Sequence, residues 1–171
     1  KRLAAAAAAA VPREARFQQL LGDVAMTEKQ PARALLRYER AVSLDPGYFG
    51  AYLAGGVAHY RTGDRAKAKA WLEQSVERLP TAPAMYFLGN IARDGGDADG
   101  ALQYYKAAAG SRSEVGQRAA AEYAAIDVAR NPANYVATAS ALDARGRVLL
   151  RLQNRAPVAL EGLVVTPVQV D

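Results

Sequence analysis

The sequence contains a single histidine, His59, which stands between Ala58 and Tyr60. A histidine can serve as a general base or a metal ligand, but both roles need partners at a defined spacing, such as a second histidine four residues away or a pair of cysteines. The sequence offers neither arrangement, and it also lacks a glycine-rich phosphate loop. We therefore expect His59 to be a packed or surface residue of a helix.

Residues 95–100, Gly-Gly-Asp-Ala-Asp-Gly, superficially resemble a calcium-binding or glycine-rich loop. They lack the regular carboxylate spacing and the closing glutamate of a calcium loop. They also fall where the repeat described below predicts a turn between two helices. These 171 residues are therefore predicted to carry no catalytic residue, no metal site and no cofactor, and so not to be an enzyme.

The composition favours an all-α body, and the length fits one domain, or one domain plus a small appendage. Alanine, the strongest helix former, supplies 39 of the 171 residues, and 51% of the residues are hydrophobic. The net charge of +5 comes from interspersed basic and acidic residues, so no nucleic-acid partner is expected. The longest apolar run, Leu3–Val11, is far shorter than the roughly 20 residues that cross a bilayer. The absence of cysteine excludes a disulfide framework.

An internal repeat of about 34 residues is the strongest pattern in the sequence. Prolines 12, 46 and 80 are 34 residues apart, and three glycines keep the same spacing with one single-residue slip. Small residues at the glycine positions let two helices approach to about 8–10 Å, and the larger recurring residues fill the space beyond. The recurring structural positions are Gly22, Gly56 and Gly89; Ala34, Ala68 and Ala101; Tyr38, Leu72 and Tyr105; and Pro46 and Pro80.

Each unit of the repeat predicts two helices. The first helices are expected at 14–26, 48–62 and 83–94, and the second at 31–44, 64–79 and 97–109. Glycine followed by aspartate separates the helices in the second and third units, where glycine ends one helix and aspartate caps the next. A further helix from about Ser113 to Ala129 is predicted to cover the last apolar face, as solenoids require.

These recurring residues resemble the tetratricopeptide repeat, whose pattern is matched by Leu21-Gly22, Ala34, Tyr38 and Pro46 and again in the next two units. The resemblance implies a mainly α fold, a right-handed superhelix of antiparallel helix pairs that binds peptides or partner proteins. The predicted organisation is 1–12, the end of a preceding repeat's second helix; 13–46, 47–80 and 81–112, three repeats; 113–130, a capping helix; and 131–171, a β extension.

After residue 131 the hydrophobic period changes from 3.6 to 2, which is typical of strands. Three extended runs, Tyr135–Leu142, Arg147–Gln153 and Val158–Val170, predict a short antiparallel β meander. Three strands with an apolar face need something to pack on. Either the sheet continues beyond Asp171, or the strands dock on the helices or on a partner.

The resemblance also implies which residues line the concave face, because the first helix of each pair faces inward in tetratricopeptide arrays. An apolar and aromatic middle with arginines at one edge suits an extended peptide or a protein partner. The alternative is that the chain's own C-terminal strands cover this groove. The groove positions are Arg16, Gln19, Asp23, Leu53, Val57, Tyr60, Arg61, Tyr86, Asn90 and Arg93.

Some tetratricopeptide domains clamp the terminal carboxylate of chaperones with Lys, Asn and Arg. The corresponding positions here hold other residues throughout, so this co-chaperone activity is not predicted. They are Gln19, Asp23, Ala54, Pro83 and Phe87.

Three proline-bearing segments, 12–17, 45–49 and 79–84, further resemble the C-terminal tail of bacterial envelope zinc metalloproteases. This resemblance implies a periplasmic or envelope protein whose tail recruits substrates or docks to assembly machinery, with zinc present only in an upstream catalytic domain. That domain would be a further partner of the tail. The alternatives are an assembly factor or lipoprotein of pilus, secretion or outer-membrane machinery, and a helical-repeat RNA-binding module.

Overall fold

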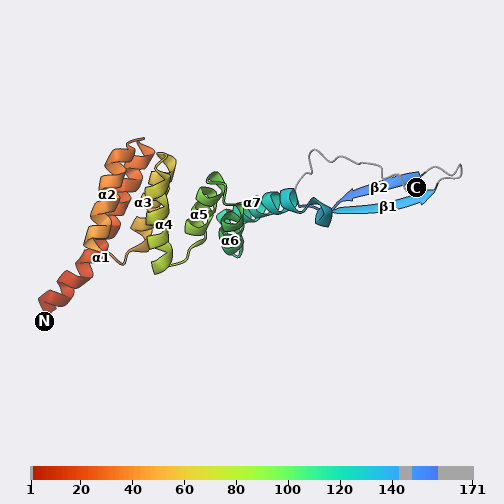
Figure 1. The fold of residues 1–171 in the computed structure, drawn as a ribbon. Coiled ribbons are helices and arrows are strands. Elements are labelled where there is room, and N and C mark those ends of the chain that lie inside the picture. The colour runs from red at the N-terminus through yellow and green to blue at the C-terminus, as the bar shows by residue number, and fades with distance from the viewer. Residues whose placement is uncertain (1, 143–147, 158–171) are drawn as a thin grey trace.

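A computed structural model describes residues 2–142 and 148–157, which form helical hairpins followed by a short β-hairpin (Figure 1). The first six helices make three successive pairs, and the seventh follows them. Their bounds are α1 Arg2–Thr27, α2 Pro31–Leu44, α3 Phe49–Arg61, α4 Arg65–Arg78, α5 Ala82–Asp94, α6 Ala98–Ala109 and α7 Glu114–Arg130.

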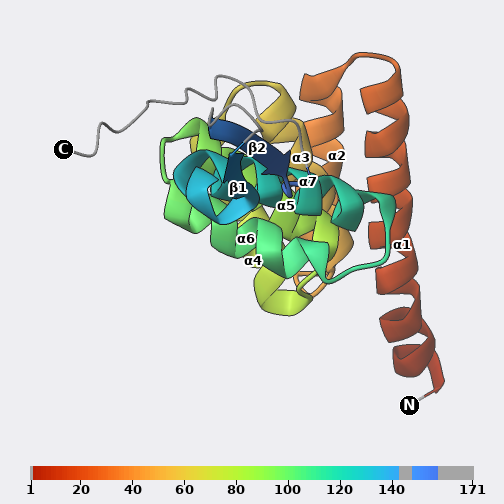
Figure 2. The same cartoon turned by 90° about the vertical axis from the view of Figure 1, so that its right-hand side faces the viewer.

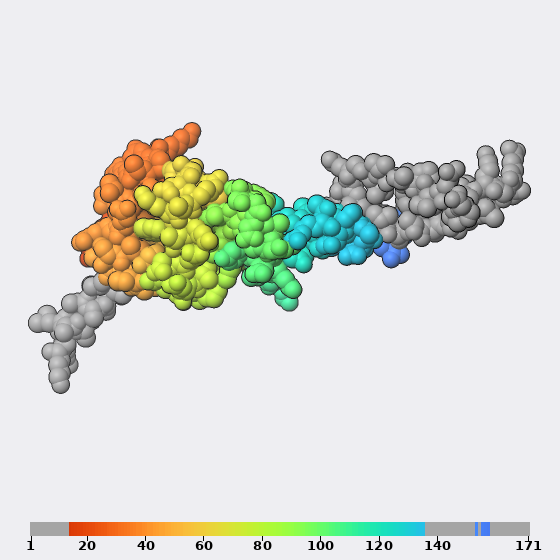
Figure 3. Space-filling model, in the orientation of Figure 1, coloured from red at the N-terminus to blue at the C-terminus, as the bar shows by residue number. Residues whose placement is uncertain are grey.

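Each pair packs on the next, and the helical part makes one continuous body in the space-filling view (Figure 3). Helix α7 packs on α6 and also touches α5, just as α3 packs on α2 and touches α1. Helix α7 therefore occupies the place that the first helix of a fourth pair would take, as the predicted capping helix requires. No helix in the described part of the chain combines the length and apolar character needed to span a membrane.

The predicted helix ends are formed by the predicted residues. The side chains of Asp64 and Asp97 each accept a hydrogen bond from a backbone N–H in the first turn of α4 and α6, and Ser113 does the same for α7. Gly63 and Gly96, with φ of +89° and +81°, make the left-handed turns before those aspartates. Residues 95–100 are thus a helix–helix turn and the start of α6, as the sequence predicts.

The three repeat glycines have matching surroundings. A Cβ atom built on Gly22, Gly56 or Gly89 would come within 2.7 Å of a side chain on the second helix of the same pair. Those side chains are Tyr38, Leu72 and Tyr105, all essentially fully buried. The sequence repeat therefore corresponds to one repeated structural contact, in which the absent Cβ makes room for a large core residue.

Helix α1 differs from its prediction at its N-terminal end. Residues 2–12 are continuous with the predicted first helix instead of forming the end of an earlier one. Proline removes one backbone donor and crowds the carbonyl four residues earlier, but the alanines that precede Pro12 have the highest helix propensity, and the helix continues through it. The result is a helix that runs well beyond the end of α2 (Figure 2).

The predicted fold class needs correction at the C-terminus, because no three-stranded meander is present in the described residues. A 3₁₀ turn, η1 Pro132–Tyr135, leads into two antiparallel strands, β1 Val136–Leu142 and β2 Val148–Asn154. The third predicted run, 158–170, lies outside the described residues. Alternating hydrophobicity predicts an extended backbone, but it does not determine how many strands pair.

The described strands also lie away from the concave face. Strand β1 contacts β2 and η1, and η1 contacts α7, so the hairpin continues the long axis of the molecule (Figure 1).

Candidate binding cleft between helices α1 and α3

A cleft of about 560 Å³ opens between the first helices of the first two repeats. Helix α1 forms one wall and α3 the other, while the buried ring of Tyr38 from α2 and the loop residue Tyr48 contribute to the lining. The lining is mostly apolar, with polar side chains from both walls. It consists of Gln19, Asp23, Met26, Thr27, Tyr38, Tyr48, Phe49, Gly50, Leu53, Ala54, Val57, Ala58 and Arg61.

The cleft is hollow because its wall carries a small residue where the next repeat carries a large one. Ala54 on α3 corresponds in the repeat to Phe87 on α5. Phe87 fills the equivalent space between α3 and α5, where its ring meets that of Tyr60 edge-on at 5.4 Å between centroids. Leu53, Val57 and Ile91 close the same space around the buried residues Leu72, Ala84 and Leu88.

Asp23 reaches the cleft with one carboxylate oxygen already bound. The hydroxyl of Tyr38 donates a 2.8 Å hydrogen bond to Asp23 Oδ1. Burial, the hydrogen bond to Asp23 and the charge of that carboxylate raise the pKa of Tyr38 well above its ordinary value. Tyr38 therefore remains a protonated donor at neutral pH and holds Asp23 in place.

The third repeat contains the same contact, in which Tyr105 donates to Asn90 Oδ1 at 2.7 Å. The second repeat has Leu72 and Val57 at these two positions. Each repeat thus pairs a tyrosine with a polar acceptor or a leucine with an apolar neighbour, so that the hydroxyls of Tyr38 and Tyr105 both have an acceptor.

Two polar groups of the cleft have no partner within the described residues. The side-chain oxygen of Gln19 is buried and accepts no hydrogen bond. Arg61 is exposed, and no hydrogen bond or ion pair to its guanidinium is formed by another described residue. A buried acceptor without a donor is costly, so a ligand that supplied an N–H to Gln19 would relieve that cost.

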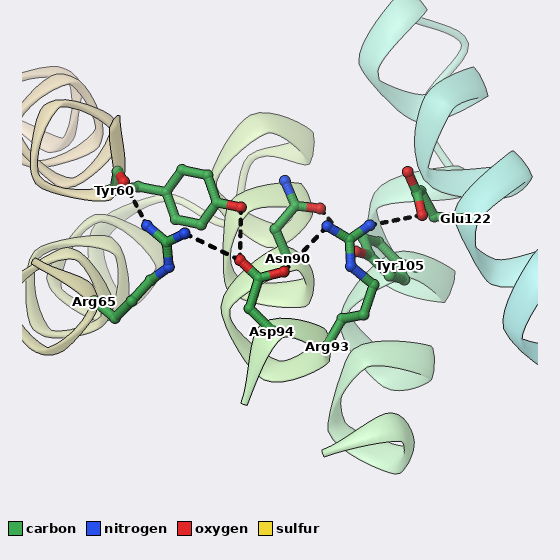
Figure 4. A network of polar contacts seen from close by, with 7 residues as sticks. All are labelled: Tyr60, Arg65, Asn90, Arg93, Asp94, Tyr105 and Glu122. Atoms are coloured by element: carbon green, nitrogen blue, oxygen red, sulfur yellow. Dashed lines mark hydrogen bonds and ion pairs between the residues drawn. The ribbon is translucent and has the colours of Figure 1, made fainter. Parts of the chain in front are cut away.

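A network of polar contacts crosses the filled space beside the cleft (Figure 4). Tyr60 on α3 donates to Asp94 Oδ2 on α5 at 2.9 Å, and Arg65 on α4 lies 3.2 Å from the same oxygen. Arg93 bridges Asp94 at 3.2 Å and Glu122 on α7 at 2.8 Å. The network therefore ties the second repeat, the third repeat and the capping helix together.

Charges in this network shift the pKa values of its members. Partial burial alone would raise the pKa of Asp94, but the hydrogen bonds from Tyr60 and Arg93 and the charges of Arg93 and Arg65 together lower it below its ordinary value. For Arg93, burial opposes the protonated form, and the surrounding tyrosine, aspartate and glutamate raise its pKa further above the neutral range. Both groups are thus ionised at neutral pH.

The structure divides the sequence-predicted groove residues into two groups. Five of them line the cleft between α1 and α3: Gln19, Asp23, Leu53, Val57 and Arg61. The others lie outside it. Arg16 stands 6.0 Å from the Tyr48 ring, Tyr60 and Arg93 belong to the network, Tyr86 contacts the rings of Phe87 and Tyr105, and Asn90 is buried.

The sequence prediction placed Ala54 at a clamp position of the groove but did not name it among the partner-binding residues, although Ala54 decides where the groove is hollow. The signal was present in the repeat, because aligning the units places Ala54 against Phe87. The lining residues Tyr38 and Tyr48 were missed for a different reason. Tyr38 comes from a second helix, whereas the groove was assumed to consist of first helices alone; Tyr48 stands at the start of the predicted helix 48–62 and caps α3, but it was not among the predicted lining positions.

His59 is a packed residue, as the sequence predicts. Its side chain is buried, and its ring meets the indole of Trp71 edge-on at 5.7 Å. Burial is the largest influence on its pKa, which falls below the ordinary value of 6.5. In the residues that the structure describes, no group of three or more metal-ligating side chains gathers around it or elsewhere.

Comparison with known families agrees with these repeated contacts. Two sequence profiles of the tetratricopeptide repeat match residues 25–88 and 82–114, which together span more than half of the chain. The chain belongs to the tetratricopeptide repeat family. Repeats of this family act as interaction scaffolds and are typically not catalytic, which agrees with the prediction that this stretch is not an enzyme. A comparison with curated protein sequences found no match.

Solved tetratricopeptide structures share the helical arrangement at low sequence identity. The N-terminal domain of stress-induced protein-1 from C. elegans is 21% identical, with a TM-score of 0.60 over 69% of this chain and 98% of that one. The Sgt2 domain from Aspergillus fumigatus is 23% identical, with a TM-score of 0.61 over 76% and 87%. The first such domain of Spaghetti (RPAP3), bound to the HSP90 peptide SRMEEVD, is 16% identical, with a TM-score of 0.63 over 69% and 94%. Similarity at this identity establishes the fold.

Proposed function

We propose that this chain holds an extended segment of a partner polypeptide in the cleft between α1 and α3. The observation that carries the proposal is the hollow beside Ala54, an apolar cleft with one unpartnered acceptor and one unpartnered cation on its walls. A related fold, the first tetratricopeptide domain of Spaghetti, is described as bound to a peptide, which supports this class of ligand.

The chemistry of the walls defines the ligand. An apolar side chain of the segment enters the space between Leu53, Ala54 and Val57. A carbonyl or carboxylate oxygen of the segment accepts from the exposed Arg61. The guanidinium of Arg93, by contrast, already binds Asp94 and Glu122, so Arg61 is the arginine available to a ligand.

The proposal is tested by selecting binders from a peptide library displayed on phage and measuring one selected peptide against variants by calorimetry. Ala54→Phe places in the cleft the side chain that the third repeat already accommodates, and it should weaken the peptide at least about tenfold, or roughly 1.4 kcal/mol. The matched control is Ala107→Phe, at an exposed position of α6. Undiminished affinity in Ala54→Phe, or an equal loss in both variants, would show that the peptide binds elsewhere.

A narrower role is proposed on the three proline-bearing segments alone: the substrate- or partner-recruiting tail of a bacterial periplasmic zinc metalloprotease. Zinc and the catalytic residues would then belong to an upstream domain, which would be a further partner of these helices. The test is to read the coding sequence that precedes Lys1. A His-Glu-x-x-His motif there supports the protease, whereas a lipoprotein signal directly before this chain supports an envelope assembly factor instead.

A further inference from the structure

A second cavity, of about 390 Å³, lies between helices α4, α5 and α6. It shares no lining residue with the cleft between α1 and α3. Its volume falls near the small end of the range for ligand pockets, about 300–1,000 Å³. Apolar and polar side chains both contribute to the lining, which consists of Lys69, Leu88, Ile91, Ala92, Gly95, Asp97, Gly100, Gln103 and Tyr104.

The second repeat shows which side chain is missing from this cavity. Ala92 and Tyr104 of the third repeat correspond to His59 and Trp71 of the second. In the second repeat the imidazole of His59 is buried and meets the indole of Trp71 edge-on, with 5.7 Å between the ring centroids. In the third repeat alanine replaces that histidine, and Ala92 and Tyr104 line the open space together. The cavity therefore lies where the second repeat holds an imidazole ring.

The change from tryptophan to tyrosine between these repeats does not by itself explain the cavity, because another residue compensates for it. Trp71 lies over Gly55, where an added Cβ atom would come within 2.3 Å of the indole. The third repeat has Leu88 at the position of Gly55, and the buried Leu88 packs with Tyr104 in one apolar cluster. The loss of the histidine ring at position 92 is the change that leaves room.

The charges that surround His59 recur around the cavity. Burial influences the pKa of His59 most and lowers it, and two carboxylates and a lysine act on it as well: Asp64, Lys67 and Glu39. Asp97 and Glu73 hold the positions of those carboxylates one repeat later. Asp97 lines the cavity, and Glu73 lies 3.9 Å from Lys69, whose side chain also lines it. Two carboxylates and one lysine thus stand near both places.

Polar groups of the cavity can serve both nitrogens of a neutral imidazole, which has one donor and one acceptor. Asp97 Oδ1 accepts from the backbone N–H of Gly100 at 2.8 Å, whereas Asp97 Oδ2 accepts no hydrogen bond from another described residue. Within the part of the chain that the structure describes, the amide of Gln103 and the hydroxyl of Tyr104 also form no hydrogen bond. An acceptor and two donors are therefore available.

We propose that this cavity binds an imidazole ring, carried either by a histidine side chain of a partner or by a small imidazole compound. The ring lies beside Tyr104, in the place of the side chain that Ala92 lacks. Its N–H donates to Asp97 Oδ2, and its other nitrogen accepts from Gln103 or from the Tyr104 hydroxyl. The site is separate from the cleft between α1 and α3, so it does not depend on the function proposed for that cleft.

The first test is a titration of imidazole into the isotope-labelled full chain at about pH 8, above the ordinary pKa of the ring, followed by NMR. The backbone amides of Ala92, Gly95 and Gly100 should shift saturably, with a dissociation constant in the millimolar range because the ligand is so small. Ala92→His places the missing ring on the chain itself and should raise that constant at least about tenfold. Ala107→His, at an exposed position of α6, is the matched control and should leave it unchanged.

Shifts that appear elsewhere and not at the cavity overturn the proposal. So does an affinity that Ala92→His leaves undiminished, or that both histidine variants reduce equally.

A reciprocal test does not rely on Ala92→His. His59→Ala opens the corresponding space in the second repeat, beside the single tryptophan of the sequence. Imidazole should therefore change the fluorescence of Trp71 and raise the thermal midpoint in His59→Ala, while the wild type should show no fluorescence change. If imidazole leaves Trp71 unaffected in the variant, positions 59 and 92 are not equivalent and the proposal fails.

Further probes test the recognition of the ring and its source. Pyrrole has the same ring size but no acceptor nitrogen, so it should bind several-fold more weakly than imidazole, and equal binding contradicts the proposal. A blocked Ala-His-Ala tripeptide that binds at least as tightly as imidazole, through the same amides, supports a histidine of a partner. Binding of imidazole and histamine without the tripeptide supports a small imidazole compound.

Discussion

Two neighbouring interfaces in this molecule are built from the same repeat positions, yet one is hollow and the other is filled. Between α1 and α3 the repeat places Met26 and Ala54, and between α3 and α5 it places Tyr60 and Phe87. The first pair leaves a cleft of about 560 Å³, whereas the second pair makes an edge-on aromatic contact. The same repeat framework thus leaves a cleft at one interface and makes a packed aromatic contact at the next.

The polar groups divide in the same way as the apolar ones. At the filled interface, Arg65, Arg93 and Asp94 satisfy one another and extend to the capping helix through Glu122. At the hollow interface, Gln19 and Arg61 have no described partner. Conformity to the repeat therefore does not determine function. Two departures from the repeat, the small residue Ala54 and polar side chains without a hydrogen-bond partner, indicate where a ligand can enter.

Removing the side chain that fills the second interface should have the largest effect. Phe87→Ala deletes a partly buried ring together with its contact to Tyr60, and we expect a loss of about 2–3 kcal/mol in the free energy of unfolding. Urea denaturation followed by circular dichroism measures it. The matched variant Ala54→Phe should change the unfolding free energy far less. Similar losses in both would mean that the two interfaces do not differ as described.

Breaking the polar network around Asp94 should lower the unfolding free energy less than Phe87→Ala does. Asp94 is partly exposed, so we expect Asp94→Asn to lower the unfolding free energy by roughly 1 kcal/mol at pH 7. Because the folded-state pKa of Asp94 lies below its ordinary value of 3.8, this stabilisation is fully present above about pH 5 and is lost as the pH falls through the folded-state value. The difference between wild type and variant should therefore shrink between pH 5 and pH 3. A difference that stays constant over that range would exclude an ionic origin.

The helices of these interfaces could be predicted from sequence because they depend on local signals. Helix α2 has the predicted bounds, and the capping aspartates and turn glycines place α4 and α6 within two residues. The glycine contacts followed from spacing alone. The continuity of α1 was not predicted, because it depends on how far an alanine-rich helix tolerates Pro12, and proline was interpreted as a boundary.

The candidate site was only partly predictable, because the availability of a side chain depends on tertiary neighbours. Arg61 and Arg93 were both predicted to line the groove, yet Arg93 meets Glu122 of a helix that the repeat does not specify. Likewise, Asp23 and Asn90 occupy groove positions but accept hydrogen bonds from tyrosines of their own repeats. Where the sequence predicted a three-stranded meander, the described residues of the C-terminal extension show two paired strands, because alternating hydrophobicity does not specify which strands pair.

The tyrosine contacts of the first and third repeats offer a finer comparison. Tyr38→Phe removes the donor to Asp23, which faces the cleft and can turn to water, so a loss of about 0.5–1 kcal/mol is expected. Tyr105→Phe leaves the buried Asn90 Oδ1 without its donor and should lower the unfolding free energy more than Tyr38→Phe does. Thermal unfolding of the two variants side by side gives the order. The reverse order would mean that Asp23 beside the cleft is no better hydrated than the buried Asn90.

The smallest effect on stability should come from the arginine that defines the hollow interface. Arg61 is exposed and has no hydrogen bond or ion pair in the described structure, so Arg61→Ala should change the unfolding free energy by less than about 0.5 kcal/mol. Arg93→Ala removes contacts to both Asp94 and Glu122 and should cost more. For the affinity of a peptide bound in the cleft we expect the reverse order, because a ligand oxygen accepts from Arg61 while Arg93 remains bound to Asp94 and Glu122. If the same arginine variant caused the larger loss in both the unfolding free energy and the peptide affinity, the proposed difference between the two interfaces would be contradicted.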